Sequence, residues 1–220
     1  DKASNLLIVP EAHTWILGRY HRIRKCLWWL SVNNYRVPAL AESVNKSLRK
    51  YHLPQAFFPI VKMWKIAKGK YHWYFYHFED NGKVFHAYNC EYARRFILKN
   101  GIQEDRTLYL CGPLNTTFFE TAQKRAGRTR ENIILYSPKK GKEFSQKLIN
   151  AAQKRGIRAE FIALQGMTPE QIAEHMSRAK VYMDFGTFPG PERIPREAVT
   201  MGCNIITSRN GAAANEIDVP

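Results

Sequence analysis

Short apolar runs alternate with segments of helical periodicity in the second part of the chain, from about residue 131 onward. Each run has the length of a buried strand. The predicted strands are Asn132–Tyr136, Ala159–Leu164, Val181–Phe185 and Asn204–Thr207. Strands that alternate with helices across short connections predict a parallel sheet covered on both faces, and ligands bind such sheets beyond the carboxyl ends of the strands.

The helices between these strands have recognisable starts and apolar faces. In the predicted helix Lys142–Arg155, Phe144 and Leu148 mark the expected buried stripe. The next helix begins at Thr168-Pro169-Glu170-Gln171, where the threonine is the expected N-cap and the glutamine completes a capping box. A shorter helix is predicted over Pro195–Met201.

The first part of the chain is less regular but also mixes strands and helices. Extended segments are predicted at Leu6–Val9, Leu27–Leu30, Phe57–Ile60, Trp73–Phe78, Val84–Tyr88 and Thr107–Leu110, and helices at His13–Arg24, Ala39–Tyr51 and Asn89–Lys99. The polar, basic stretch Thr121–Arg130 has no strong apolar pattern, so we expect the domain junction there, with domains over 1–125 and 126–220. The predicted class is α/β, with two Rossmann-like domains built on parallel sheets with helices on both faces.

Positive charge is concentrated in the first part. The chain carries 34 Lys and Arg against 19 Asp and Glu, a net charge of +15. Up to Arg130 there are 22 basic and 9 acidic residues, which gives +13, whereas the remainder has 12 and 10, which gives +2. This asymmetry favours a polyanionic partner such as a nucleic acid, an anionic membrane face or a phosphate-bearing substrate, although a solvated lysine-rich surface has the same composition.

Composition excludes several other classes of protein. With 220 residues, of which 45% are hydrophobic and 24% charged, the chain can bury a sizeable core. No apolar run reaches the length of a membrane span, and no secretory leader opens the sequence. The four cysteines lack C-x-x-C spacing, which argues against a zinc site or a disulfide framework and favours a cytoplasmic protein.

Two loops that follow predicted strands are candidate anion sites. The first, Tyr136–Gly141, contains Lys139 and Lys140 and leads into a helix, whose N-terminus attracts negative charge. It matches neither the Walker A nor the G-x-G-x-x-G pattern, and an ordinary solvated turn is the alternative interpretation.

The second loop, Asp184–Ala198, is rich in Gly, Pro, Arg and Glu. Its arginines match the geometry of a diphosphate, a carboxylate in the following helix can accept hydrogen bonds from ribose hydroxyls, and glycine allows the backbone to approach a ligand. Alternatively, the arginines pair with the glutamates of the same loop, and the second glutamate only complements the helix dipole. The candidate residues are Gly190, Glu192, Arg193, Arg196 and Glu197.

Residues 184–216 resemble the nucleotide-sugar half of GT-B glycosyltransferases, most closely glycosyltransferase family 4 and its capsule and O-antigen relatives. The run Arg196–Gly211 is similar to the "EAxxxGxPVIxSxxGG" segment of that fold, and Lys140-Gly141 resembles its lysine–glycine pair. The resemblance implies that Lys140, with Lys139, contacts the donor diphosphate and that Glu197 holds the ribose. Pro189 stands where the family's E-x7-E motif has its first glutamate, which leaves Glu192 as a shifted candidate for the sugar-contacting carboxylate.

The resemblance therefore implies a glycosyltransferase that moves a sugar from a nucleoside-diphosphate sugar to a polysaccharide or glycolipid acceptor, without metal or cofactor. It covers the last part of the chain well and the first weakly, through Phe85–Ala93, and it implies that the chain is incomplete for a GT-B enzyme. The catalytic candidates are His13 and Glu192. We expect a protein of the cytoplasm, peripheral at the inner face of the membrane.

Two other functions remain open. One is a non-enzymatic nucleic-acid-binding protein, favoured by the charge and by the aromatic run at Tyr71–Phe78, although no RRM, KH, zinc-finger or helix-turn-helix signature is present. The other is a sugar-nucleotide epimerase of the same fold.

Overall fold

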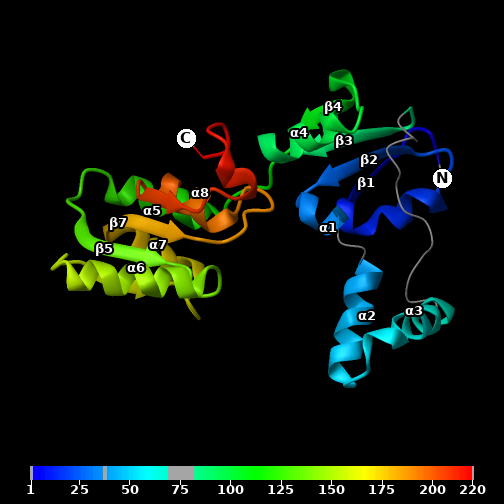
Figure 1. Ribbon diagram of the computed structural model, residues 1–220. Coiled ribbons are helices and arrows are strands. Elements are labelled where there is room, and N and C mark those ends of the chain that lie inside the picture. Colours follow the sequence, from blue (N-terminus) through cyan, green and yellow to red (C-terminus); the bar gives the residue numbers. More distant parts are fainter. Residues whose placement is uncertain (1, 37–38, 69–81, 220) are drawn as a thin grey trace. The chain divides into compact units, whose positions relative to one another are not determined.

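The computed structural model describes residues 2–36, 39–68 and 82–219, which form two compact units, Asp1–Cys111 and Gly112–Pro220 (Figure 1). Each unit contains a four-stranded sheet in which all neighbouring strands are parallel. The predicted α/β class with two parallel sheets is confirmed. The predicted strand at Trp73–Phe78 lies outside the described residues.

Unit 1 has its strands in sequence order, β1-β2-β3-β4. The strands are β1 (Leu6–Pro10), β2 (Arg24–Trp29), β3 (Val84–Tyr88) and β4 (Thr107–Tyr109). The helices are the 3₁₀ segments η1 (Glu11–Arg19), η2 (Gln55–Phe57) and η4 (Glu104–Arg106), and α1 (Val32–Arg36), α2 (Ala39–Lys50), α3 (Phe58–Ala67) and α4 (Glu91–Lys99). Four of the predicted strands and the predicted helices Ala39–Tyr51 and Asn89–Lys99 are confirmed.

The core of unit 1 is built around Trp29, which is fully buried on β2. Its indole Nε1–H donates a 2.9 Å hydrogen bond to Nδ1 of His86, which is also fully buried, on the neighbouring strand β3. The two rings stack at 6.1 Å, and Tyr35 and Phe96 pack edge-on against Trp29. Burial, aided by the charge of Arg106, lowers the pKa of His86 to about 4, so this imidazole is neutral at physiological pH.

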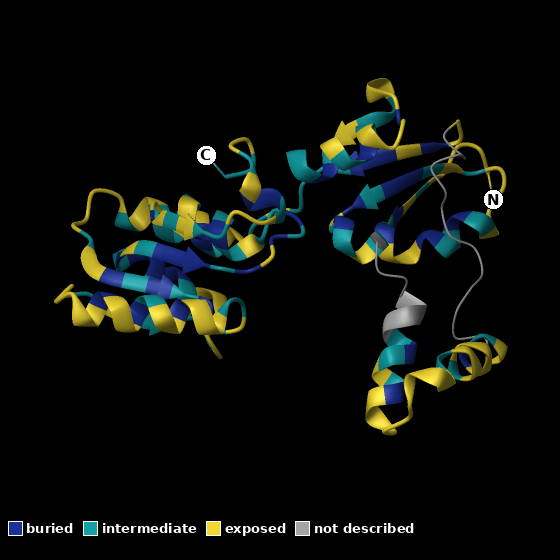
Figure 2. Ribbon diagram, viewed as in Figure 1, coloured by how far each residue is buried: buried dark blue, intermediate teal, exposed yellow. Residues whose placement is uncertain are grey.

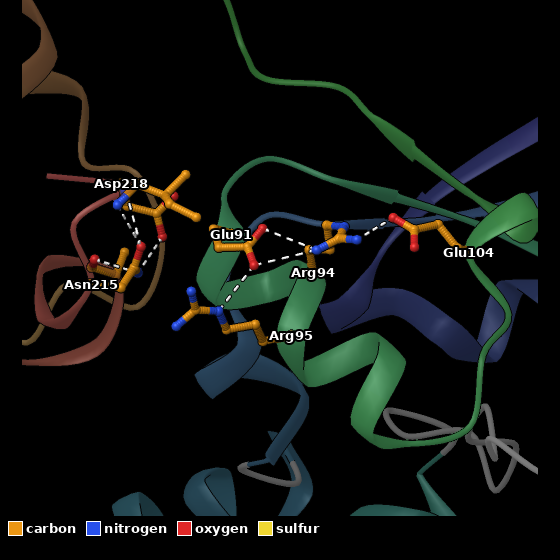
Figure 3. Close-up of polar contacts among 8 residues, drawn as sticks. Glu91, Arg94, Arg95, Glu104, Asn215 and Asp218 are labelled. Atoms are coloured by element: carbon orange, nitrogen blue, oxygen red, sulfur yellow. Dashed lines mark hydrogen bonds and ion pairs between the residues drawn. The ribbon is translucent and has the colours of Figure 1, made fainter. Parts of the chain in front are cut away.

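Helix α4 covers part of this core with its apolar face. Ala93 and Ile97 are buried, and the helix ends at Asn100 before Gly101, whose φ is +87°. On the outer side Glu91 pairs with both Arg94 and Arg95, and Arg94 also pairs with Glu104 (Figure 3). These ion pairs tie the helix to the segment that leads into β4.

Three predictions for unit 1 are wrong in physically informative ways. Phe57–Ile60 was expected to be extended, but α3 begins at Phe58, because Pro59 in the first turn needs no N–H partner. The expected helix His13–Arg24 is a 3₁₀ segment that stops at Arg19, and β2 already starts at Arg24. No helix was predicted between Leu30 and Ala39, but α1 lies there, and its start is fixed by Glu11: this buried carboxylate accepts hydrogen bonds from Leu30 N at 2.8 Å and Ser31 N at 3.1 Å.

One face of the unit 1 sheet is only partly covered by the described part of the chain. The register pairs Ile8 with Cys26 and Cys26 with Phe85, so alternate residues of these strands point to the same side. The large apolar side chains exposed on that side are Leu6, Ile8, Phe85 and Leu108.

Unit 2 has the strand order β6-β5-β7-β8, in which the direction of winding reverses between β5 and β7. Its strands are β5 (Glu131–Tyr136), β6 (Glu160–Ala163), β7 (Ala179–Asp184) and β8 (Asn204–Thr207), as predicted. Its helices are α5 (Thr116–Arg125), α6 (Lys142–Lys154), α7 (Pro169–Arg178), α8 (Arg193–Thr200) and the 3₁₀ segment η5 (Gly211–Ala214). Because βαβ crossovers are right-handed, α6 covers one face of the sheet while α7 and α8 cover the other, and α5 lies with the latter pair (Figure 1).

The core of unit 2 lies between the sheet and the layer of α5, α7 and α8. Phe118 of α5 is 1% exposed and packs in this core, so α5 belongs to unit 2 and the compact units divide between Cys111 and Gly112. The sequence placed the domain boundary after residue 125, because it gave α5 no apolar pattern. The buried residues of this core are Phe118, Ile133, Leu135, Ala173, Met176, Ala179, Tyr182, Ala198, Met201 and Cys203.

For two helices of unit 2, one local prediction from the sequence is confirmed and the other is wrong. The capping box at α7 is present in full: Gln171 N donates to Thr168 Oγ1 and Thr168 N donates to Gln171 Oε1. In α6 the buried stripe is rotated, because Ser145 and Ile149 are buried while Phe144 is exposed.

Arg130 also stabilises unit 2, although it lies in the basic stretch Thr121–Arg130, where the sequence predicts only a domain junction. Its guanidinium donates to the carbonyl oxygens of Met176 and Ala179 at 3.1 and 2.7 Å, and to that of Met201. These carbonyls lie at the carboxyl ends of α7 and α8, where helices leave acceptors unpaired. A single cation therefore satisfies two helix ends.

Candidate functional site

The candidate site lies where the loops after β5 and β7 meet, at the point where the strand order reverses. This is the position at which open α/β sheets bind ligands. Gly141 ends the first loop with φ of +62°, and a Cβ there would come within 2.5 Å of the carbonyl oxygen of Phe185 in the second loop. A Cβ on Gly186 would in turn come within 2.9 Å of Lys140 Cδ. Glycine at these two positions is therefore what allows the loops to interlock.

Lys140 is the basic side chain that this packing brings to the site. Its Nζ forms an ion pair with Glu192, and both side chains remain partly exposed. The sequence proposed Lys140 and Glu192 for separate roles and did not predict that they contact each other. Lys139, the neighbouring candidate, is exposed.

Asp184 holds the second loop in place and was given no role in the sequence analysis. It is buried at the end of β7, where its Oδ1 accepts a 2.9 Å hydrogen bond from Gly186 N and its Oδ2 accepts one of 3.0 Å from the Tyr182 hydroxyl. Burial raises the pKa of Asp184, and the hydrogen bonds and Lys140 oppose that shift. Burial and the Asp184 charge also raise the pKa of Tyr182, which keeps this hydroxyl a donor.

The loop after β8 is fastened to the loop after β7. Ser208 Oγ donates a 2.5 Å hydrogen bond to the carbonyl oxygen of Gly186, and Ala212 N donates one of 2.8 Å to that of Phe188. Phe188 is buried with φ of +43°, a conformation that side chains rarely adopt, and a Cβ on Gly211 would collide with its carbonyl oxygen. Three adjacent strand ends therefore present one connected set of loops.

Helix α8 positions the remaining candidates differently from the expectation. The helix begins at Arg193, so Glu197 lies in its second turn and not in its first. Pro195 is tolerated inside the first turn because the N–H groups there have no helical partner. The predicted position of Glu197 in the first turn is therefore wrong, and the alternative interpretation, in which this carboxylate only complements the helix dipole, loses its basis.

Glu197 is 2% exposed and pairs with Arg193, whose Nε lies 3.2 Å from Glu197 Oε1. Burial raises the pKa of Glu197, and the charges of Arg193 and Arg196 oppose this shift. Arg193 is itself 73% exposed, so the ion pair joins a buried carboxylate to a largely solvent-exposed arginine.

Arg196 contacts protein in this structure: its Nη1 donates a 3.1 Å hydrogen bond to the carbonyl oxygen of Gly112. Gly190 is buried in the loop before the helix. The binding roles of both residues stay predictions.

His13, the other catalytic candidate, belongs to unit 1. It is exposed in η1 just after β1, at a point where the backbone departs from helical geometry (φ −126°, ψ 31°). The buried acid near it in the sequence, Glu11, was not singled out as a candidate, yet it accepts hydrogen bonds from two backbone N–H groups of the β2–α1 connection and one of 3.1 Å from Asn34 Nδ2 in α1. A carboxylate directly after a strand was the only signal for it.

The arrangement in unit 2 is suited to an anion. Lys139 and Lys140 immediately precede α6, whose first N–H groups have no helical partners. Among the residues that the structure describes, no group of three His, Cys, Asp or Glu is placed to hold a metal ion. Within the same residues, no helix combines the length and apolar character that a membrane span requires.

Comparisons with known proteins give similarity in structure alone. No family model matches the sequence, and no curated protein does. A glycosyltransferase from Rickettsia africae ESF-5 aligns over 97% of this chain and 81% of its own, with a TM-score of 0.42 and 11% identity. Anabaena HepE, solved in complex with UDP and glucose, aligns over 95% of this chain and 81% of its own, with a TM-score of 0.39 and 13% identity.

Proposed function

We propose that unit 2 binds a nucleoside-diphosphate sugar where the β5 and β7 loops meet, and that the protein is a glycosyltransferase of GT-B type. The observation that carries this proposal is the interlocked pair of loops, in which Gly141 and Gly186 bring Lys140 to the N-terminus of α6. That combination of cation and helix N-terminus stabilises a diphosphate. The resemblance of residues 184–216 to the donor half of such enzymes agrees with this position.

The chemistry of sugar transfer requires charge to be stabilised on the departing diphosphate. In the proposed site Lys140, supported by Lys139 and the N–H groups of α6, performs this role, so transfer proceeds without a metal ion. Gly190, Arg193 and Arg196 complete the donor site around the loop before α8. Arg196 would have to exchange the Gly112 carbonyl for phosphate oxygens to contribute directly.

The diphosphate of the donor and the carboxylate of Glu192 compete for Lys140, because Lys140 already forms an ion pair with Glu192. A diphosphate that binds Lys140 displaces Glu192, which frees this carboxylate to face the sugar. We assign Glu192 the sugar-contacting, catalytic role on this basis. Glu192→Gln then lowers the rate of transfer while nucleotide affinity stays the same or rises, because a competing negative charge has been removed.

We assign Glu197 to the ribose hydroxyls. Its buried carboxylate is paired with Arg193, so in this proposal nucleotide binding breaks the ion pair as the exposed arginine turns toward the diphosphate. One movement would then supply both a phosphate ligand and a ribose ligand. A buried carboxylate that accepts two hydroxyl donors makes charge-assisted hydrogen bonds of the stronger kind.

We assign the acceptor to unit 1, with His13 at the reacting hydroxyl. The acceptor is a glycan or a lipid-linked glycan, and the basic excess of the first 130 residues suits an anionic surface or a lipid diphosphate. A protein of the cytoplasm, peripheral at the inner face of the membrane, fits this assignment.

The test is nucleotide binding by calorimetry with UDP and GDP. Lys140→Ala removes a charged hydrogen bond to phosphate, worth about 1.5–3 kcal/mol, so the dissociation constant should rise by about ten- to a hundredfold. Lys154→Ala, at the opposite end of α6, is the matched control and should change nothing. Equal affinities for the wild type and Lys140→Ala would remove this lysine from the site. Product analysis with a donor sugar then separates a transferase from an epimerase, which releases an altered nucleotide sugar.

A further inference from the structure

Helix α3 displays its largest apolar side chains to solvent. Ile60, Met63 and Trp64 are 64%, 61% and 52% exposed, and Phe57 at the end of η2 is also exposed. Figure 2 shows most of α3 in the colour of exposed residues. A helix that packs against its neighbour normally does the opposite and turns its apolar face inward. Exposed residues this large on a single helix turn mark an interaction surface.

The side of α3 that faces its neighbour α2 carries a lysine. Lys65 is 9% exposed, and its Nζ donates hydrogen bonds of 2.8 Å to the carbonyl oxygen of Ser43 and 2.6 Å to Ser43 Oγ. These bonds fix the rotation of α3, because turning the helix to bury Trp64 would expose Lys65 and break both of them. The outward apolar face is therefore the specified arrangement.

The turn between α2 and α3 is also well defined. After α2 ends, His52 has φ of +51°, Leu53 N donates to the Leu48 carbonyl oxygen at 2.9 Å and His52 N donates to that of Arg49 at 3.3 Å. This is the Schellman arrangement that terminates helices. The α2–α3 hairpin is thus a preformed element that presents one apolar face.

The charges of the hairpin are predominantly positive, and its one acidic residue is Glu42 near the start of α2. From residue 43 to residue 68 there is no acidic residue, and the basic residues other than Lys65, which faces α2, are Lys46, Arg49, Lys50, Lys62 and Lys68. Lys68 Nζ lies 4.1 Å from the centre of the Trp64 ring, and Lys50 Nζ lies 5.3 Å from that of Tyr51. Cations beside exposed aromatic rings are suited to the boundary between lipid headgroups and acyl chains, where lysine stems lie along apolar surface.

We propose that the α2–α3 hairpin docks the protein on an anionic lipid bilayer, with Phe57, Ile60, Met63 and Trp64 inserted below the headgroups and the lysines paired with lipid phosphates. Charge complementarity commits the surface to anionic lipid, and the insertion of large apolar side chains distinguishes it from a nucleic-acid site, which would bind through phosphate contacts and exposed base-stacking rings. The inference deepens the acceptor side of the proposed function, because a lipid-linked acceptor lies in such a bilayer.

Vesicle flotation without any sugar donor tests this docking separately from transfer. Vesicles of phosphatidylcholine with about 30% of the anionic lipid phosphatidylglycerol are compared with vesicles of pure phosphatidylcholine. We expect at least tenfold stronger partitioning to the anionic vesicles. Equal partitioning to both compositions, or none to either, would overturn the proposal while leaving nucleotide binding untouched.

Two matched pairs of variants assign the contact. Ile60→Ser combined with Trp64→Ser should reduce partitioning at least tenfold, whereas Ile157→Ser combined with Ile217→Ser, at equally exposed positions of unit 2, should not. Lys46→Glu with Arg49→Glu and Lys50→Glu should also reduce it, whereas Lys154→Glu with Arg155→Glu and Arg158→Glu should not. Circular dichroism and thermal unfolding verify that each variant is folded.

Lipids brominated along the acyl chain provide an independent reading of depth. They should quench the tryptophan fluorescence of the wild type, and Trp64→Phe should lose most of that quenching while still binding. If charge reversal abolishes binding but the apolar pair binds normally and no quenching occurs, contact is electrostatic only and insertion is refuted. If single-stranded oligonucleotide binds at physiological salt in competition with vesicles, the partner is nucleic acid instead.

Discussion

His86 should make the stability of unit 1 depend on pH. Its folded-state pKa is about 4, against 6.5 for an unperturbed histidine, because the ring is buried and the positive charge of Arg106 acts in the same direction. Between these values the unfolded chain binds the proton and the folded chain does not, so stability falls as the pH falls. The contribution is fully present above about pH 6.5 and is lost progressively down to about pH 4.

The size of the effect follows from the two pKa values. A difference of about 2.5 pH units, at 1.36 kcal/mol for each unit, corresponds to about 3 kcal/mol. That is a substantial part of the free energy of unfolding of a small unit. His86→Asn removes the titration and keeps an acceptor, because the amide oxygen can occupy the place of Nδ1 and accept from Trp29.

The assay is urea unfolding followed by tryptophan fluorescence at a series of pH values. The chain has five tryptophans, Trp15, Trp28, Trp29, Trp64 and Trp73, and all of them lie within unit 1, so the signal reports that unit alone. The wild type should lose about 3 kcal/mol more than His86→Asn between pH 6.5 and 4. Parallel pH profiles for the two proteins would refute the reasoning that His86 is held neutral.

Two further predictions concern unit 2, followed by far-ultraviolet circular dichroism because it lacks tryptophan. Arg130→Met should lower the free energy of unfolding by about 2–4 kcal/mol, because it leaves the carbonyl oxygens of two helix ends without their charged donor. Arg128→Met, at an exposed position, is the control and should change the free energy of unfolding by almost nothing. Equal stabilities of the two variants would contradict this role of Arg130. Thr168→Ala should lower the free energy of unfolding by about 1 kcal/mol, because Gln171 N loses the N-cap hydrogen bond to Thr168 Oγ1. An unchanged midpoint of urea unfolding would contradict this prediction.

The sequence predicts unit 2 better than unit 1 because the elements of unit 2 depend mainly on residues that are neighbours in the chain. The strands of unit 2 are short apolar runs, and its helix α7 begins with a capping box that needs only neighbouring residues. In unit 1, α1 depends on Glu11, a carboxylate about twenty positions earlier in the chain. No periodicity in residues 31–35 could indicate that contact.

The candidate site was predicted at the level of loops but not of contacts. The positions of Lys140 and Glu192 could be read from their strands, but their ion pair depends on how the two loops pack. Asp184 was missed because its role is to hold Gly186 N, which becomes visible only when the turn is known. The start of α8 was misjudged by two residues because Pro195 is compatible with either the first or the third helical position.

The most direct test of the central claim compares nucleotide and pyrophosphate binding to Glu197→Gln by calorimetry. Glutamine keeps the shape of the buried side chain and weakens the hydrogen bonds to ribose. We therefore expect near-normal melting and a nucleotide affinity at least tenfold lower, about 1.4 kcal/mol, with pyrophosphate affinity unchanged. Glu160→Gln, at an exposed position on β6, is the control. Unchanged nucleotide affinity, or an equal loss for nucleotide and pyrophosphate, would contradict the assignment of this site to the ribose of a nucleoside-diphosphate sugar.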